Sequence, residues 1–320
     1  MERETVNKLD EKFWEGKKVM VTGGEGFIGS HLVDKLVSFD ADVTVFAKAN
    51  FTGSQPNLSN LSQSMSKIKL IAGHVGEKDA VTQIIKAEPE VIMHLAAIAF
   101  VDYSFEHPFE VINTNYIGTL NVLQAAMNSG VERVVVTSSS EIYGTAQREK
   151  IDENHPLNPT SPYAASKAAA DRTAFSFWNT YRLPIAIIRP FNTYGPRHTY
   201  DVIPKFIRLA LKGDPLTIYG SGEQSRDFTY VDDMVRAFLT MGSDKKAIGE
   251  AVNFGTGKDV SINDIAQKVV AIAKSKSKIV HVEKRMAEVA KLICDYGKAA
   301  KLFGWKPEIA RTSRSNRLPS

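Results

Sequence analysis

Short apolar, β-branched runs alternate with longer runs of helical periodicity over residues 17–192, and this rhythm restricts the fold more than any other feature. The strand candidates are apolar on both faces, which indicates parallel strands buried between two layers of helices. We therefore predict an α/β fold built on a doubly wound parallel sheet. Strands are expected at residues 17–23, 42–47, 67–73, 90–97, 131–140 and 183–192, and helices at residues 27–39, 79–87, 116–130 and 161–181.

The composition changes after about residue 190, where Gly, Pro and polar residues become frequent in "FNTYGPRHTYDVIP" and "GDPLTIYGSGEQSRDF". We expect residues 1–189 to form a dinucleotide-binding domain and residues 224–255 to return to its sheet. Residues 190–223 and 256–310 would then form a smaller, interleaved substrate domain over the strand ends, where ligands of such sheets bind. The segment 311–320 is interpreted as a disordered tail or a cloning remnant.

Composition excludes several classes of function. The 320 residues contain no apolar run near the ~20 needed for a membrane helix, and the N-terminal segment lacks the apolar core of a signal peptide. One cysteine, Cys294, excludes an internal disulfide and a cysteine-cluster metal site. The formal charge of +4 falls to about +1 without the three arginines of residues 311–320. We predict a cytoplasmic enzyme without a metal, membrane or nucleic-acid partner.

The stretch "VMVTGGEGFIGSHL" places glycines where the first strand turns into the first helix. Gly24, Gly26 and Gly29 satisfy one phosphate-binding spacing, and Gly23, Gly26 and Gly29 satisfy another. Missing side chains allow backbone N–H groups to approach a pyrophosphate at the helix N-terminus. A glycine turn needed only for packing is the alternative, but this position near the N-terminus favours a dinucleotide site.

The acidic residue that usually binds the adenosine ribose is missing from its usual position. It should follow the glycines by about 20 residues, at the end of the second strand, but no Asp or Glu occurs from Val43 to Gly76. Ala47 stands near that position, with Lys48 beside it. Because a lysine attracts a 2′-phosphate, the sequence leans slightly towards NADP over NAD; NAD bound through other contacts is the alternative.

Tyr163 and Lys167 share one helix face in "SPYAASKAAAD" because they are four residues apart. Ser161 is suited to cap this helix, and Pro162 suits its first position. An ammonium near a phenol should lower the phenol pKa towards the range of a general base. Such a pair often lies on the surface without function, but the upstream serines and glycine turn favour catalysis.

Seven motifs, in this order, resemble the extended short-chain dehydrogenases/reductases that act on nucleotide sugars. They are "TGGEGFIGSHL", "HLAA", "NYIGTLNVLQAA", "TSSSEIYG", "SPYAASK", "RPFNTYGPR" and "RDFTYVDD", and the resemblance covers residues 17–307. It implies a Rossmann-type sheet, an NAD or NADP cofactor and a nucleotide-diphosphate sugar as substrate.

The resemblance also implies roles for individual residues. Tyr163 would be the base on the sugar 4-hydroxyl, Lys167 would hold the nicotinamide ribose, and Ser139 would bind the same sugar oxygen as Tyr163. Substrate diphosphate would be held by Asn192, Arg197 and Arg226, although a solvated or carboxylate-paired arginine is the alternative. The implied cofactor-binding residues are Gly23, Gly26, Phe27, Ile28, Gly29, Lys48, His74, Val75, Leu95, Ala96, Ala97, Asn115, Tyr163, Lys167 and Pro190. His74 departs from the family, where an Asp usually meets the adenine.

Glu141 distinguishes the possible reactions. Dehydratases of the family carry a glutamate two residues after the active Ser or Thr, as in Ser139-Ser140-Glu141, because a 4,6-dehydratase needs a base at C5. Ser140 leaves the acid unassigned, since some dehydratases have an aspartate there and others a serine. The resemblance favours a 4,6-dehydratase, with a UDP-N-acetylglucosamine-type substrate indicated by "FNTYGPR" and residues 161–181.

Other activities stay open. A 4-epimerase would use Glu141 only as a loop acid, while nucleotide-sugar decarboxylases also carry a Glu at this position, and a 4-keto reductase is a further alternative. A cofactor-sensing regulator without catalysis is disfavoured because Ser139, Tyr163 and Lys167 are all present. Relatives pair the helices at residues 115–130 and 161–181 across a two-fold axis, which implies a homodimer.

Overall fold

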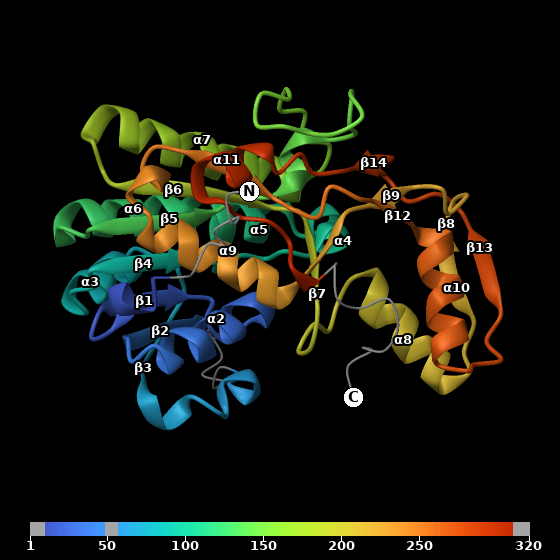
Figure 1. The fold of residues 1–320 in the computed structure, drawn as a ribbon, viewed down its shortest axis with the longest axis horizontal. Helices are drawn as coiled ribbons and strands as arrows, with labels where there is room; N and C mark the ends of the chain where they lie inside the picture. The colour runs from blue at the N-terminus through green and yellow to red at the C-terminus, as the bar shows by residue number, and fades with distance from the viewer. Residues whose placement is uncertain (1–9, 49–56, 310–320) are drawn as a thin grey trace, which may run out of the picture.

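The computed structural model describes residues 10–48 and 57–309, so the predicted tail at 311–320 lies outside the described residues. Its centre is a seven-stranded sheet in the order β11-β6-β5-β4-β1-β2-β3, with every neighbouring pair parallel (Figure 1). This confirms the predicted doubly wound α/β fold. The strands are β1 (Lys18–Thr22), β2 (Asp42–Lys48), β3 (Ile68–Gly73), β4 (Val91–His94), β5 (Arg133–Thr137), β6 (Ile185–Pro190) and β11 (Ala251–Phe254).

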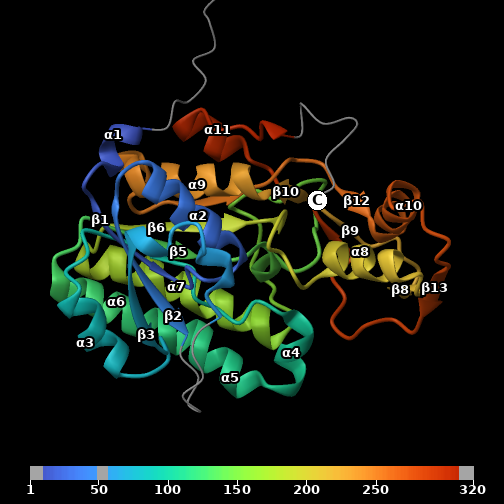
Figure 2. The ribbon, with the colours of Figure 1, turned by 90° about the horizontal axis from the view of Figure 1, so that it is seen from below.

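Helices cover both faces of this sheet (Figure 2). One face packs against α2 (Phe27–Ser38), α9 (Val231–Ser243), α11 (Gly297–Phe303) and the short α1 (Glu11–Trp14). The other packs against α3 (Asp79–Lys86), α6 (Gly118–Ser129) and α7 (Pro162–Tyr181), with α4 (Val101–Glu106) and α5 (Pro108–Ile112) beside α7. Each face of the sheet forms an apolar core with its helices. Because side chains alternate along a strand, one strand contributes to both cores, as Met20 and Val21 of β1 do.

Local sequence explains where α7 begins and where α6 begins and ends. Ser161 caps α7 by accepting a hydrogen bond from the Ala164 amide at 3.1 Å, and Pro162 opens the helix, as predicted. Gly130 ends α6 in the left-handed conformation, with φ of 64°. A π-helical segment, η3 (Asn113–Ile117), precedes α6, so the helix expected from residue 116 starts with a wider turn.

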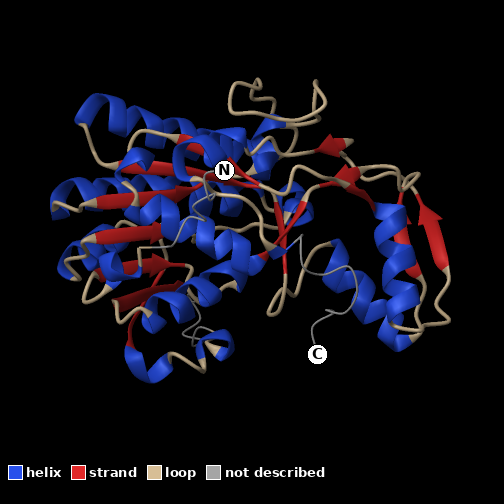
Figure 3. Cartoon of the chain, in the orientation of Figure 1, coloured by secondary structure: helices blue, strands red, loops and turns tan. Residues whose placement is uncertain are grey.

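A smaller region lies beyond the carboxyl ends of the large sheet, on the right in Figure 3. It contains α8 (Val202–Lys212), α10 (Ile262–Ile272) and the pair β8 (Leu216–Tyr219) and β13 (Ile279–Val282). Short strands connect the two parts: β7 (Asn192–Tyr194) with β10 (Phe228–Tyr230), and β9 (Ser225–Arg226) with β12 (Val260–Ser261) and β14 (Lys291–Leu292). The remaining single turns are η1 (Ser59–Leu61), η2 (Met65–Lys67), η4 (Ser140–Tyr143) and η5 (Lys245–Ala247).

Two negative findings hold for the described ranges. Across residues 10–48 and 57–309, no helix has the length and apolar character to cross a membrane. Nor does this part of the chain bring together three His, Cys, Asp or Glu side chains in a group that could hold a metal ion.

Candidate active site

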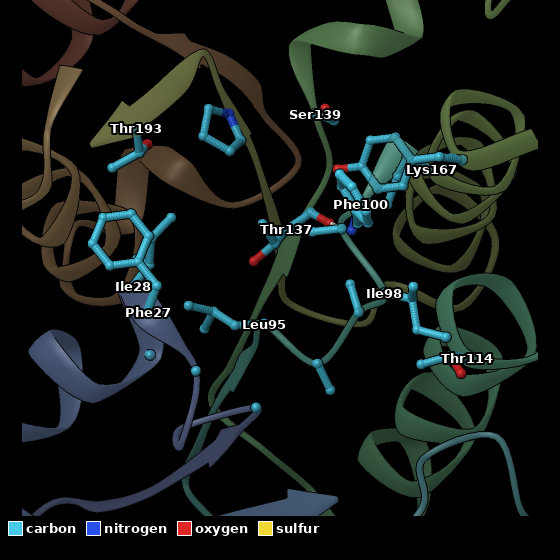
Figure 4. A pocket seen from close by; sticks show the side chains of 18 of the residues that line it. Phe27, Ile28, Leu95, Ile98, Phe100, Thr114, Thr137, Ser139, Lys167 and Thr193 are labelled. Carbon is cyan, nitrogen blue, oxygen red and sulfur yellow. Dashed lines mark hydrogen bonds between the residues drawn. The ribbon is translucent and has the colours of Figure 1, made fainter. Parts of the chain in front are cut away.

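A cavity of about 390 Å³ opens at the carboxyl ends of the sheet strands, within the size range of small-molecule sites. The glycine turn, the segment after β4, the end of β5, α7 and the segment after β6 contribute to its lining. Figure 4 shows Lys167 across the cavity from Phe27 and Ile28. The predicted catalytic and cofactor residues all line it except Asn115, and of the predicted substrate residues only Asn192 does.

The glycine turn can close against the segment after β4 only because side chains are absent. Gly23 has φ of 69°, and a Cβ atom there would lie 2.8 Å from the backbone of Ala96. A Cβ on Gly29 would lie 2.2 Å from the Gly23 carbonyl oxygen. Gly26 is the N-cap residue of α2 and makes no side-chain cap, and residues 26–29 at this start of the helix line the cavity. This cradle fits the pyrophosphate of a dinucleotide.

His74 and Lys48 line the end of the cavity nearest β2 and β3. The buried His74 ring accepts a hydrogen bond from the Gly76 amide at 3.1 Å and lies 3.4 Å from the Thr114 hydroxyl. Burial, aided by the Lys48 charge, lowers the pKa of His74, which favours the neutral ring. The Lys48 ammonium lies 3.4 Å from the Glu110 carboxylate.

Asn115 has a structural position behind the cavity. Its side-chain oxygen accepts from the Ile98 amide at 2.8 Å, and its amide donates to the Ile98 carbonyl and to Ser166 Oγ at 3.1 and 3.0 Å. Asn115 therefore joins the segment after β4, which lines the cavity, to α7, which carries the catalytic candidates.

Ser139, Tyr163 and Lys167, the residues predicted to carry out the reaction, all line the cavity. Ser139 follows β5, while one turn of α7 places Tyr163 and Lys167 on the same face. All three are buried. The Lys167 ammonium donates to the Thr137 carbonyl, which fixes its position at the end of β5.

The pKa of Tyr163 differs from the sequence prediction. Burial raises the pKa of its phenol above the usual range, and a hydrogen bond with Ser139 opposes this increase. The predicted lowering by Lys167 is not seen: burial has the largest effect, and the charges of Glu141 and Asp201 raise the pKa further. Burial also lowers the pKa of Lys167 to about 8, while the charge of Asp171 opposes this effect.

Glu141 and Ser140 belong to the turn η4 directly after Ser139. The Ser139 hydroxyl accepts a hydrogen bond from the Glu141 amide at 3.2 Å, which orients the turn. Burial raises the pKa of the Glu141 carboxyl, although Arg226 and Arg285 pull it down. A carboxylate with a raised pKa on a cavity wall is a better proton acceptor than a solvated one.

The two predicted diphosphate arginines are engaged by carboxylates. Arg197 lies 2.7 Å from Asp34 of α2. Arg226 lies 3.4 Å from Glu288 and 3.9 Å from Glu141, and it also donates to the carbonyls of Ser225 and Val289. Both arginines are therefore paired with carboxylates, which was the alternative considered from the sequence. Their binding to the substrate diphosphate stays a prediction.

Several cavity residues were missed by the sequence reasoning. Thr137 and Tyr200 line the cavity, and neither has a local sequence pattern that indicates it. Glu25 also lines the cavity, and its place between two glycines of the phosphate-binding turn was a visible signal.

Comparison with known proteins agrees with this geometry. The family model described as GDP-mannose 4,6 dehydratase matches residues 20–314. A dTDP-D-glucose 4,6-dehydratase of Mus musculus is 38% identical over 263 residues, covering 81% of this chain and 73% of the relative. A putative UDP-glucose 4-epimerase of Methanocaldococcus jannaschii is 35% identical over 296 residues, covering 91% of this chain and 93% of the relative.

Among solved structures, DesIV, a dTDP-glucose 4,6-dehydratase of Streptomyces venezuelae with NAD and TYD bound, superposes with a TM-score of 0.84. The two chains are 30% identical, and the match covers 91% of this chain and 92% of DesIV. The family match spans nearly the whole chain, and most of the residues predicted from the family resemblance line one cavity. The chain therefore belongs to the GDP-mannose 4,6-dehydratase family of extended short-chain dehydrogenases/reductases and is a nucleotide-sugar enzyme of that family.

Proposed function

We propose that this chain is a nucleotide-sugar 4,6-dehydratase acting on a UDP-N-acetylglucosamine-type substrate. The observation that supports it most is the Glu141 carboxyl on the wall of the cavity that also contains Ser139 and Tyr163. A 4,6-dehydratase needs a proton acceptor for C5 in addition to the base at the 4-hydroxyl, and these residues supply both.

In the proposed reaction, Ser139 holds the oxygen of the sugar 4-hydroxyl and Tyr163 receives its proton. Because burial favours the protonated phenol, this role would require the positive charges of Lys167 and of an oxidised nicotinamide to favour the phenolate. A nicotinamide dinucleotide, held by the glycine turn and Lys167, would supply the hydride chemistry needed at C4 and C6. The C4 ketone acidifies the C5–H bond, and Glu141 takes that proton. Glu141 passes this proton to the 6-hydroxyl, which leaves as water. Addition of hydride at C6 and of a solvent proton at C5 then gives the 4-keto-6-deoxy sugar.

The remaining predicted residues have supporting roles in this proposal. Ser140 lies buried beside Glu141, and Asn192 faces the cavity where the substrate diphosphate would lie. Arg197 and Arg226 are retained as diphosphate ligands; both would exchange a carboxylate contact for phosphate when substrate binds. We place the enzyme in the cytoplasm.

We also propose a homodimer built on α6 and α7. Apolar side chains are exposed on this side of the molecule: Phe109 and Ile112 of α5, Met127 of α6 and Phe175 of α7. Phe109 is 88% exposed, an unfavourable state for an aromatic ring in a monomer.

Incubation with UDP-N-acetylglucosamine in deuterated water tests the reaction. Loss of the 6-hydroxyl with deuterium at C5 supports the dehydratase, whereas inversion at C4 without solvent label would identify the 4-epimerase instead. Loss of carbon dioxide from a UDP-glucuronate substrate would identify a decarboxylase.

The Glu141→Gln variant tests the assigned base. We expect bound cofactor to be reduced by the sugar as in the wild type, while elimination stops. Glu288→Gln is the matched control, because Glu288 also contacts Arg226 but does not line the cavity; it should retain elimination. Elimination at the wild-type rate by Glu141→Gln would show that another group removes the C5 proton.

A further inference from the structure

The Glu25 side chain places a carboxylate at the end of β2, where the strand itself has no Asp or Glu to bind the adenosine ribose. The last residue of β2, Lys48, donates its backbone N–H to Glu25 Oε1 at 2.8 Å. The carboxylate therefore lies at the carboxyl end of β2, although it comes from the glycine turn 23 residues earlier in the chain. Asn60 holds the turn by donating to the Glu25 carbonyl at 3.0 Å.

The second carboxylate oxygen of Glu25 is buried and has no hydrogen-bond partner among the described residues. Burial raises the pKa of this carboxyl, and the Lys48 amide only partly opposes the shift. A buried carboxylate oxygen without a donor is costly, so a structure usually supplies one from the protein, water or a ligand. Glu25 also lines the cavity, so its carboxylate is a candidate acceptor for a ligand bound there.

The charges near Glu25 and Lys48 disfavour binding of the 2′-phosphate of NADP. Lys48, which the sequence suggested as a 2′-phosphate ligand, lies 3.4 Å from Glu110. Glu110 also accepts a hydrogen bond from Tyr103 at 2.5 Å, which favours its charged form. A 2′-phosphate would thus meet the Glu25 carboxylate and a lysine already paired with a second carboxylate.

We propose that Glu25, reaching from the glycine turn, accepts hydrogen bonds from the adenosine ribose hydroxyls and selects NAD over NADP. A ribose diol offers the donor that the buried oxygen lacks, whereas a 2′-phosphate replaces that donor with negative charge. The inference rests on the nicotinamide dinucleotide required by the proposed function. It reverses the slight lean towards NADP drawn from the missing acid and Lys48.

The test is calorimetric titration of the cofactor-free protein with NAD and, separately, with NADP. We expect the wild type to bind NAD more tightly. Glu25→Gln keeps the side-chain size and an acceptor for Lys48 but removes the charge. Loss of a charged hydrogen bond should reduce the ratio of NAD to NADP affinity by roughly 10- to 100-fold.

Two further variants make the outcome specific. Glu25→Ser, which is small enough to admit a 2′-phosphate, should also reduce the ratio, so the test does not depend on one substitution. Glu132→Gln makes the same charge change just before the amino end of β5, at the end of the sheet away from the cavity. There it removes only the ion pair with Lys17, so it should leave the ratio of NAD to NADP affinity unchanged.

The possible failures are distinct. If both Glu25 variants fold and bind dinucleotides with the wild-type ratio, the assignment of Glu25 is wrong and the proposed function stands. Wild-type preference for NADP would also refute it. If the wild type binds neither dinucleotide, both the assignment and the proposed function are refuted.

Discussion

His94 should make the stability of this protein strongly dependent on pH. It ends β4, is fully buried, and its ring contacts Thr22 Oγ1 at 2.8 Å and Thr119 Oγ1 at 3.0 Å. The Thr119 hydroxyl already donates to the Asn115 carbonyl at 2.6 Å, so it can only accept from His94 Nε2–H. Nδ1 then accepts from Thr22, and a neutral ring satisfies both contacts.

The magnitude follows from the pKa of this ring, which burial and the Lys167 charge lower from 6.5 to about 3. Below pH 6.5 His94 is protonated in the unfolded chain but stays neutral in the folded chain, so the free energy of unfolding falls as the pH falls. Each pH unit between the two pKa values costs about 1.4 kcal/mol. Between pH 7.5 and pH 5, His94 alone should therefore reduce the free energy of unfolding by roughly 2 kcal/mol.

Urea unfolding followed by circular dichroism at pH 7.5, 6.5, 5.5 and 5.0 measures this contribution. We compare the wild type with His94→Gln, which cannot titrate in this range. The variant should be less stable at pH 7.5, yet it should lose roughly 2 kcal/mol less than the wild type on acidification. Val135→Ala, a cavity variant in the adjacent strand β5, controls for destabilisation itself and should keep the wild-type pH dependence.

Equal losses of stability for the wild type and His94→Gln over this pH range would refute the reasoning. That result would mean that His94 is protonated as easily in the folded protein as in the unfolded chain. The two threonine contacts would then not hold the neutral ring.

Two further predictions concern folding and assembly. Asp171→Asn should lower the free energy of unfolding by about 3–5 kcal/mol, because it leaves the Arg189 charge buried without its carboxylate, which now lies 2.8 Å away. The control Asp42→Asn breaks an exposed pair with Lys69 and should cost under about 1 kcal/mol in the same urea titration. Light scattering should give twice the chain mass of 35.3 kDa at micromolar concentration. Phe109→Lys should shift the protein towards monomer, and a monodisperse wild-type monomer would contradict the dimer.

The sequence by itself determined the features that depend on neighbours along the chain. Alternating strand and helix patterns predicted the parallel sheet, because each period reflects local backbone geometry. The Ser161 cap and the pairing of Tyr163 with Lys167 on one face of α7 followed from spacings of three and four residues. The glycine turn was recognisable for the same reason, since its conformation is set within seven residues.

Only the tertiary structure decided the features that depend on burial and on distant partners. It raised the pKa of Tyr163, because desolvation comes from elements far away in sequence. The tertiary structure also pairs Arg226 with Glu288 and Arg197 with Asp34, and no local sequence pattern indicates these ion pairs. The Glu25 carboxylate reached the end of β2 only when the glycine turn and that strand packed side by side. A search along the second strand missed it, because the sheet brings together residues that the chain separates.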